Sequence, residues 1–197
     1  MGARGAAGFY YGEGSSLRKN HKVMYNHFDS YPDYLGVNVL EGCRKFSIKK
    51  MREIFPQILL VDAQDIPSQE ELESLEVQLG GNPNTNGDNN WYWLLRDFQG
   101  GLEKVLEHKI MTNGFDFLGD GLFCEYAYII NLNTGELEVY RGFSRGNTAV
   151  GRYTSLKDKN DDMNYDSVTF LTSFDLMEYI PSDQEFLDKI KSLDPDD

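Results

Sequence analysis

Polar side chains concentrate in residues 25–32, Tyr-Asn-His-Phe-Asp-Ser-Tyr-Pro, where the surrounding hydrophobic pattern predicts the end of a strand. Pro32 closes the segment, because proline has no N–H with which to continue a strand ladder. Functional groups are concentrated on connections held by a rigid scaffold, and such connections often form the rim of a pocket. The segment therefore predicts a site, although it does not by itself name a reaction.

His27 and Asp29 are the two residues of this segment with catalytic chemistry. On a strand, residues two apart share a face and lie about 7 Å apart. The histidine would act as a general base near neutral pH, oriented by the carboxylate; partial metal coordination is a second interpretation. The structural alternative is that backbone groups satisfy both side chains at a strand end. No metal is predicted, because no second histidine or acidic cluster with ligand spacing accompanies the pair.

Four further residues are candidates for ligand binding. Arg4 would bind a carboxylate or phosphate through two parallel hydrogen bonds, or would instead form a structural salt bridge to Asp29. Asn26 would fix a polar group. Tyr25 and Tyr31 offer aromatic faces for a base or sugar, with core packing as the alternative.

The elements that position these residues begin with a predicted hairpin. Residues 1–12 are small and then aromatic, which suits a strand that another backbone approaches closely. Residues 13–21 form a polar connection. Residues 22–28 return as a strand with Val23, Tyr25 and His27 on one face. Because the two strands are consecutive, Arg4 is expected near the end of its partner strand.

The middle of the chain is predicted to be mostly helical. One helix with a wide apolar stripe spans 37–54, and another begins at the capping-box pattern of 68–71 and continues to Leu79. A short apolar run at 58–61 is too brief to assign. The Asn-rich segment 82–90 predicts a loop, and apolar spacing predicts a central helix over 91–106.

The last third returns to strands. Segments 123–132 and 137–143 predict a hairpin around the turn 133–135, and 168–174 predicts another strand. A long polar loop over 144–166 would contain a short strand at 152–156. A capping box at Ser182 starts a last helix, and residues 190–197 form a frayed tail. The order predicts a single α+β domain over 1–197, with antiparallel sheets packed by helices.

Composition narrows the classes of function. The 197 residues include 32 acidic and 19 basic side chains, for a net charge of −13, which disfavours an extended nucleic-acid surface. Two cysteines, Cys43 and Cys124, support neither a disulfide framework nor a zinc site. Neither a signal peptide nor a membrane-spanning run is indicated, so a cytoplasmic protein without cofactors is expected.

The motif at 25–32, with Leu35-Gly36 shortly after it, resembles a family of uncharacterised small proteins from phages, bacteria and some fungi. The resemblance covers most of the chain, including Met-Gly-x-Arg-Gly at 1–5 and the strand pair at 126–132 and 137–142. A second resemblance, in architecture, is to N-terminal nucleophile hydrolases with a four-layer αββα fold. Gly2 stands where those enzymes carry their nucleophile, which excludes amide cleavage by that route.

Two classes of function follow from these observations. In the first, a phage-type accessory protein binds, and in one version hydrolyses, a nucleotide-like or amide-bearing ligand at the N-terminal hairpin, using Arg4, Asn26, His27 and Asp29. In the second, a non-catalytic anti-defence or interaction protein binds a host protein through its acidic surface or sequesters a signalling ligand. Convergence of the four residues at one pocket would favour the first class.

Overall fold

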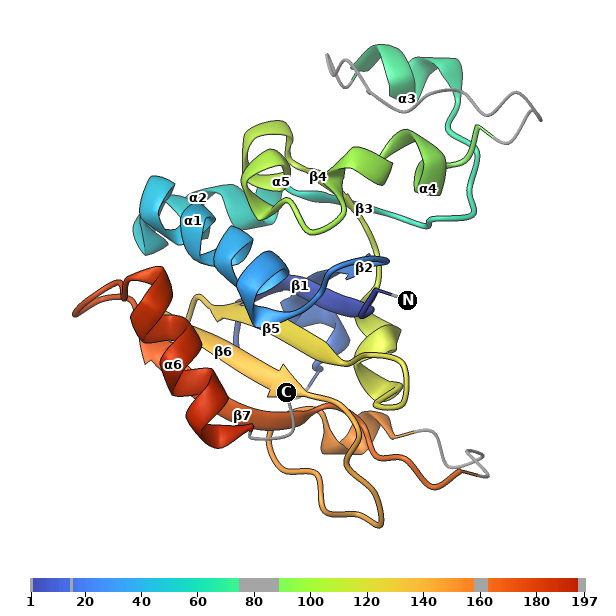
Figure 1. The fold of residues 1–197 in the computed structure, drawn as a ribbon. Helices are drawn as coiled ribbons and strands as arrows, with labels where there is room; N and C mark the ends of the chain where they lie inside the picture. The colour runs from blue at the N-terminus through green and yellow to red at the C-terminus, as the bar shows by residue number, and fades with distance from the viewer. Residues whose placement is uncertain (1, 15, 75–88, 158–162, 195–197) are drawn as a thin grey trace.

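The computed structural model describes residues 2–14, 16–74, 89–157 and 163–194. A five-stranded mixed sheet forms its centre, with helices packed against it in an α+β arrangement (Figure 1). In sheet order the strands are β2 (His21–Asn26), β1 (Gly5–Tyr10), β5 (Tyr126–Asn131), β6 (Glu136–Arg141) and β7 (Thr169–Asp175). A separate two-stranded parallel sheet joins β3 (Leu59–Val61) and β4 (Ile110–Thr112).

Both predicted hairpins are confirmed. β1 and β2 are antiparallel, and so are β5 and β6. In the β5–β6 turn, the Asn131 side chain accepts the Asn133 N–H at 3.1 Å, and Gly135 takes φ +82, a conformation that glycine adopts without strain. A correction concerns the centre of the sheet, where β1 and β5 are parallel. The helical middle of the chain separates these strands, so local patterns carry no information about their pairing.

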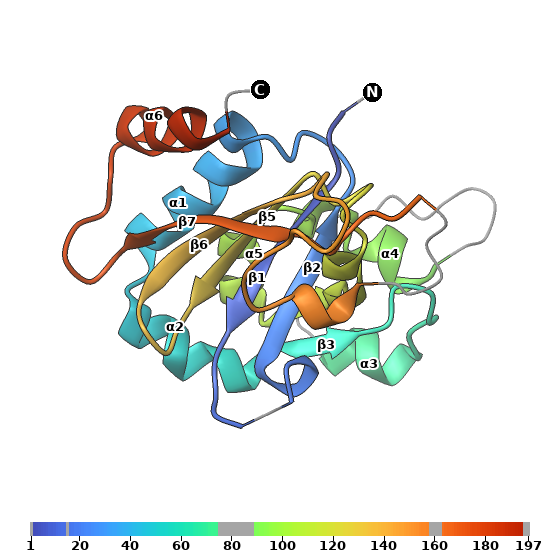
Figure 2. The same ribbon diagram turned by 90° about the horizontal axis from the view of Figure 1, so that it is seen from below.

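Helices cover one face of the sheet, as Figures 1 and 2 show. They are α1 (Val37–Lys45), α2 (Ile48–Ile54), α5 (Leu102–His108) and α6 (Asp183–Leu193). The π-helical turn η2 (Pro32–Gly36) directly precedes α1. The capping box predicted for α6 is present: the Ser182 hydroxyl accepts the Glu185 N–H, and the Glu185 carboxylate accepts the Ser182 N–H.

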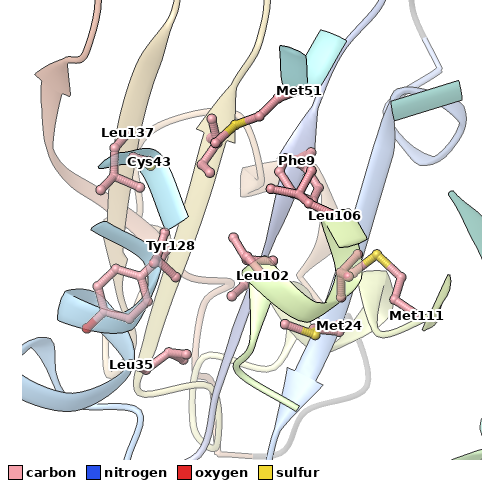
Figure 3. Close-up of a cluster of buried hydrophobic side chains, with 14 of the residues drawn as sticks. Phe9, Met24, Leu35, Cys43, Met51, Leu102, Leu106, Met111, Tyr128 and Leu137 are labelled. Carbon is pink, nitrogen blue, oxygen red and sulfur yellow. The ribbon is translucent and has the colours of Figure 1, made fainter. Parts of the chain in front are cut away.

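The larger hydrophobic core lies between these helices and the sheet. Figure 3 shows its side chains pointing toward one another from strands and helices. Phe9, Met24 and Tyr128 come from the sheet, while Met51 and Leu102 come from α2 and α5, and all five are essentially inaccessible to solvent. Burial of this apolar surface is the main stabilising contribution of the layer, at roughly 25 cal/mol per Å².

The opposite face of the sheet is covered by short turns rather than by long helices. Ala6, Val23 and Ile129 alternate with the residues of the larger core and pack against η5 (Phe115–Gly119), η6 (Thr154–Leu156) and Tyr153. The described strands therefore form one large sheet and one small sheet, without the two stacked large sheets of the αββα arrangement.

Two predicted helices are interrupted. The helix predicted over 37–54 divides at Ser47, whose hydroxyl caps α2 by accepting the Lys50 N–H at 3.2 Å. The helix predicted over 91–106 divides into α4 (Trp91–Leu94), η4 (Arg96–Phe98) and α5. Leu95 leaves the helical conformation at φ −101 and ψ 16, and Gly100 takes φ +75 and separates η4 from α5. Local polar caps and glycine conformation override the apolar periodicity at both points.

Other differences are smaller. The strand predicted at 152–156 is wrong, since Thr154–Leu156 is a 3-10 turn with Tyr153 directed into the core. The run at 58–61 is resolved as β3, and its partner β4 was not predicted. The capped helix at 68–79 is described only as α3 (Gln69–Ser74). The rest of it, most of the loop at 82–90 and residues 195–197 of the tail lie outside the described residues.

None of the helices within the described ranges combines the length and apolar character that crossing a membrane requires.

Candidate functional site at the end of the N-terminal hairpin

The turn after β2 is built by Asn26. Its amide donates to the Phe28 carbonyl and to the Ser30 hydroxyl, the latter at 2.8 Å. Asn side chains that bond to nearby backbone in this way compete with strand pairing, so β2 ends here rather than at residue 28. Asp29 then takes φ 52, and the Ser30 N–H returns to the Ala3 carbonyl at 3.1 Å. Gly5 permits this close approach, because a Cβ there would lie 2.6 Å from the Ser30 Cβ.

The hairpin register places Arg4 beside His27. Gly5 pairs with Asn26 and Ala6 pairs with Tyr25, so the next position outward sets Arg4 against His27. Tyr25 and His27 also interact directly, with the Tyr25 hydroxyl 2.6 Å from His27 Nδ1. The ring of Phe117, in η5, packs edge-on against Tyr25 at 4.9 Å. The hairpin geometry thus brings Arg4, Tyr25 and His27 together.

Tyr25 is linked to both of the other side chains. The Arg4 guanidinium lies close enough to the Tyr25 oxygen to oppose the rise in the pKa of Tyr25, and a guanidinium can only donate to that oxygen. We assign the Tyr25 proton to the bond with His27 Nδ1, since a phenol is the better donor and an imidazole nitrogen the better acceptor. The neutral His27 ring then carries its proton on Nε2, which makes that nitrogen a donor.

Arg96 of η4 completes the arrangement. Its Nη1 donates to the Tyr92 hydroxyl at 2.7 Å, and its guanidinium lies 5.3 Å from the Trp93 ring and 5.9 Å from the Phe28 ring. Such cation–π contacts hold a guanidinium in place without neutralising its charge. We call Arg4, Tyr25, His27 and Arg96 the hairpin-end cluster.

The electrostatics of the cluster favour an anion. Desolvation and the positive charges of Arg96 and Arg4 lower the pKa of His27. Desolvation raises the pKa of Tyr25 despite the opposing effect of Arg4. Within the described parts of the chain, Arg4 and Arg96 have no carboxylate at ion-pair distance, whereas Arg18, Arg44, Arg141 and Arg152 each have at least one. Arg52 and Arg145 also lack one, but they donate to the Leu132 carbonyl and the Tyr165 hydroxyl away from His27. All outward groups of the cluster are donors or cations.

The remaining predicted site residues lie elsewhere. Asn26 is buried on the opposite face from Tyr25 and is occupied by the turn. Asp29 is exposed beside Gly2, and the hydrogen bond to His27 comes from Tyr25 rather than from this carboxylate. Tyr31 packs edge-on against Tyr126 at 6.4 Å and lines a different hollow of about 440 Å³ between η2 and α6.

A second polar cluster lies on the sheet face covered by η6. The buried Glu138 carboxylate accepts from Arg152 Nη2 at 2.7 Å, from the Tyr140 hydroxyl at 2.7 Å and from Asn131 at 2.8 Å. His21 Nε2 lies 2.9 Å from the Tyr153 hydroxyl. We call His21, Glu138, Tyr140, Arg152 and Tyr153 the sheet-face network.

Burial shifts the ionisation of the sheet-face network strongly. Desolvation lowers the pKa of His21 to about 4, because the charged ring would lie in a buried pocket near Arg152. Desolvation also raises the pKa of Tyr153 and Tyr140. For Glu138, burial opposes ionisation, but the hydrogen bonds from Arg152 and Tyr140 outweigh it and lower the pKa. Each charge in this network is matched internally.

Sequence reasoning missed Arg96 and the sheet-face network. Arg96 follows Tyr92 by four residues in an aromatic run, a spacing that brings side chains together on a helical turn. Glu138 lies between Leu137 and Val139 on β6, so its side chain points to the opposite face of the sheet from theirs, and that face is also covered. A buried carboxylate requires a cation, but the sequence offered no way to choose Arg152 as that partner.

Among the described residues, no group of three or more His, Cys, Asp or Glu side chains is arranged to hold a metal ion.

Comparison with known proteins gives no match: no protein-family model, no curated protein and no solved structure is similar to the chain at a significant level.

Proposed function

We propose that this protein binds a small anionic ligand at the hairpin-end cluster. The observation that carries the proposal is the position of Arg4 and Arg96 beside His27, in a chain of net charge −13. Both guanidiniums are half-buried, and neither has a carboxylate partner among the residues that the structure describes. An acidic protein has enough carboxylates to neutralise all of its arginines. The two arginines of this cluster are instead held by aromatic and phenolic groups, so their charges are available for an external anion.

The ligand chemistry follows from the donors. Arg4, Arg96 and His27 Nε2–H offer only donors outward, which suits a phosphate or carboxylate and disfavours an amide that must also donate. This supports the nucleotide-like alternative over the amide-bearing one. In a phage setting, which the sequence resemblance suggests, sequestering an anionic signalling compound is a use that such a site would serve.

The hydrogen bond between Tyr25 and His27 supports binding over hydrolysis. A general base needs a free lone pair, but His27 Nδ1 is engaged by Tyr25, and Nε2 carries the proton in the tautomer that we assign. Asp29, the carboxylate expected to orient the base, does not contact the ring. Incubation of the protein with bound anions is therefore expected to return them unchanged in mass; a product that disappears in His27→Ala would overturn this part.

The test is calorimetric titration with inorganic pyrophosphate at low salt. The wild-type protein should bind, and Arg4→Gln and Arg96→Gln should each weaken binding by at least about 10-fold, as expected for a charged hydrogen bond. Arg44→Gln is the matched control, because this guanidinium is paired with Glu41 and Asp183 on α1 and α6. Absence of binding by the wild type, or retention by both variants, would overturn the proposal and favour the protein-partner alternative.

A further inference from the structure

The hairpin-end cluster borders a hollow that it does not itself line. This hollow has a volume of about 320 Å³ and lies against η5 and the segment that follows it. The residues that line it include Phe123, Leu156 and Tyr165, together with the carboxylate residue Asp120. The volume is at the lower end of the range for small-molecule sites, and aromatic walls with a few polar groups are typical of them.

Phe123 contacts the hairpin-end cluster and also lines the hollow. The Arg4 guanidinium lies 4.3 Å from the centre of the Phe123 ring, and the same ring lines the hollow. A second junction is η5, whose Phe117 packs against Tyr25 while its Asp116 and Gly119 line the hollow. A molecule with its anion at Arg4 is thus within reach of the hollow.

The two places have opposite hydrogen-bonding character. The cluster presents donors, whereas the hollow presents a carboxylate. Asp120 Oδ1 accepts the Phe123 N–H at 3.1 Å, and Oδ2 accepts no hydrogen bond from the residues that the structure describes. Asp116 is already paired with Arg18. Phe123 is 43% exposed, which leaves part of its ring open to a flat partner.

We propose that the hairpin-end cluster and this hollow are two halves of one nucleotide site, with the phosphate groups at Arg4 and Arg96 and the base against Phe123. This inference rests on the proposed function and adds the class of ligand. A nucleotide supplies what both halves require: an anion that only accepts, and a flat ring whose N–H groups donate to Asp120. Stacking of a base on an aromatic side chain adds to the affinity for the nucleotide whichever base it carries, because every base has a flat π-face.

The experiment compares pyrophosphate, ADP, GDP and the free nucleosides by calorimetric titration on the intact protein. The nucleoside diphosphates should bind at least about 5-fold more tightly than pyrophosphate, as expected for one stacked base. Phe123→Leu and Asp120→Asn should bring that ratio toward one. Asp120→Asn retains an oxygen for the Phe123 N–H, so the local turn is preserved.

The ratio of affinities is the decisive measurement, because Phe123→Leu also removes a contact of Arg4. Phe170→Leu is the control, since this ring is 37% exposed on β7 and packs against Tyr140 instead. Equal affinity for pyrophosphate and nucleotides, with both lost in Arg4→Gln, would overturn the nucleotide inference and leave the anion site standing. Failure of every anion to bind would overturn both.

Discussion

The hairpin-end cluster and the sheet-face network contain similar residue types but satisfy them differently. Each combines arginine, histidine and tyrosine around the same sheet. In the sheet-face network, Glu138 neutralises Arg152, and each hydrogen bond ends on another protein group. In the hairpin-end cluster, Arg4 and Arg96 are held in place by aromatic and phenolic groups, and no described carboxylate neutralises them. Residue type alone therefore does not distinguish a structural network from a binding site. The location of the counter-charge does.

The largest effect is expected from opening the closed network. Glu138→Gln leaves the Arg152 guanidinium partly buried without a counter-charge, and should lower the free energy of unfolding by about 3 kcal/mol. Urea denaturation measures the change. The double variant Glu138→Gln, Arg152→Gln should cost less than the sum of the two single changes, because it removes both charges together. Additive costs would show that the two side chains are not coupled.

Acid is expected to weaken the sheet-face network through His21. The pKa of His21 is about 4 in the folded protein and about 6.5 when unfolded, so the unfolded chain takes up the proton first. Stability should therefore fall as pH drops from about 6.5 to about 4, by about 3 kcal/mol in total. Urea titrations across this range, compared with His21→Asn, isolate the contribution; an equal pH dependence in the variant would contradict it.

A smaller effect is expected at Asp166, another carboxylate with internal partners. It accepts from Lys157 at 2.7 Å and from the backbone N–H groups of Asn147, Thr148 and Ala149. Burial alone would raise the pKa of Asp166, but these bonds lower it to about 2. Its contribution should be complete above about pH 4 and lost as pH falls toward 2.

A substitution of Asp166 tests at neutral pH whether its carboxylate holds these backbone amides. Asp166→Asn should cost about 2 kcal/mol, since several hydrogen bonds lose their charged acceptor. Hydrogen exchange of the three amides should accelerate in the variant while amides of β5 stay protected. Unchanged exchange at all three would mean that the carboxylate does not hold this loop.

The smallest effect on stability is expected at the hairpin-end cluster. Arg4→Gln and Arg96→Gln remove guanidiniums that neutralise no described carboxylate, so each should change the free energy of unfolding by less than about 1 kcal/mol. Thermal unfolding at low salt measures this. A loss as large as that of Glu138→Gln would assign the cluster a structural role and remove the contrast between the two regions.

Local patterns predicted much of the framework. Both hairpins, β7 and the capped α6 follow from turn chemistry and alternation within short segments. The proximity of Arg4 to His27 also follows from the hairpin, because its register is set by consecutive strands. The helices over 37–54 and 91–106 were predicted too long, since Ser47 and Gly100 act through backbone detail that apolar spacing does not reveal.

The sequence by itself determined that an arginine lies near a histidine at the end of the first hairpin. Only the tertiary structure decided what surrounds them. Arg96 arrives from a segment far along the chain, Tyr25 replaces Asp29 as the partner of His27, and Asn26 turns away into the core. The reason is physical: a hairpin fixes its register through adjacent hydrogen bonds, whereas counter-charges and cavities depend on long-range packing.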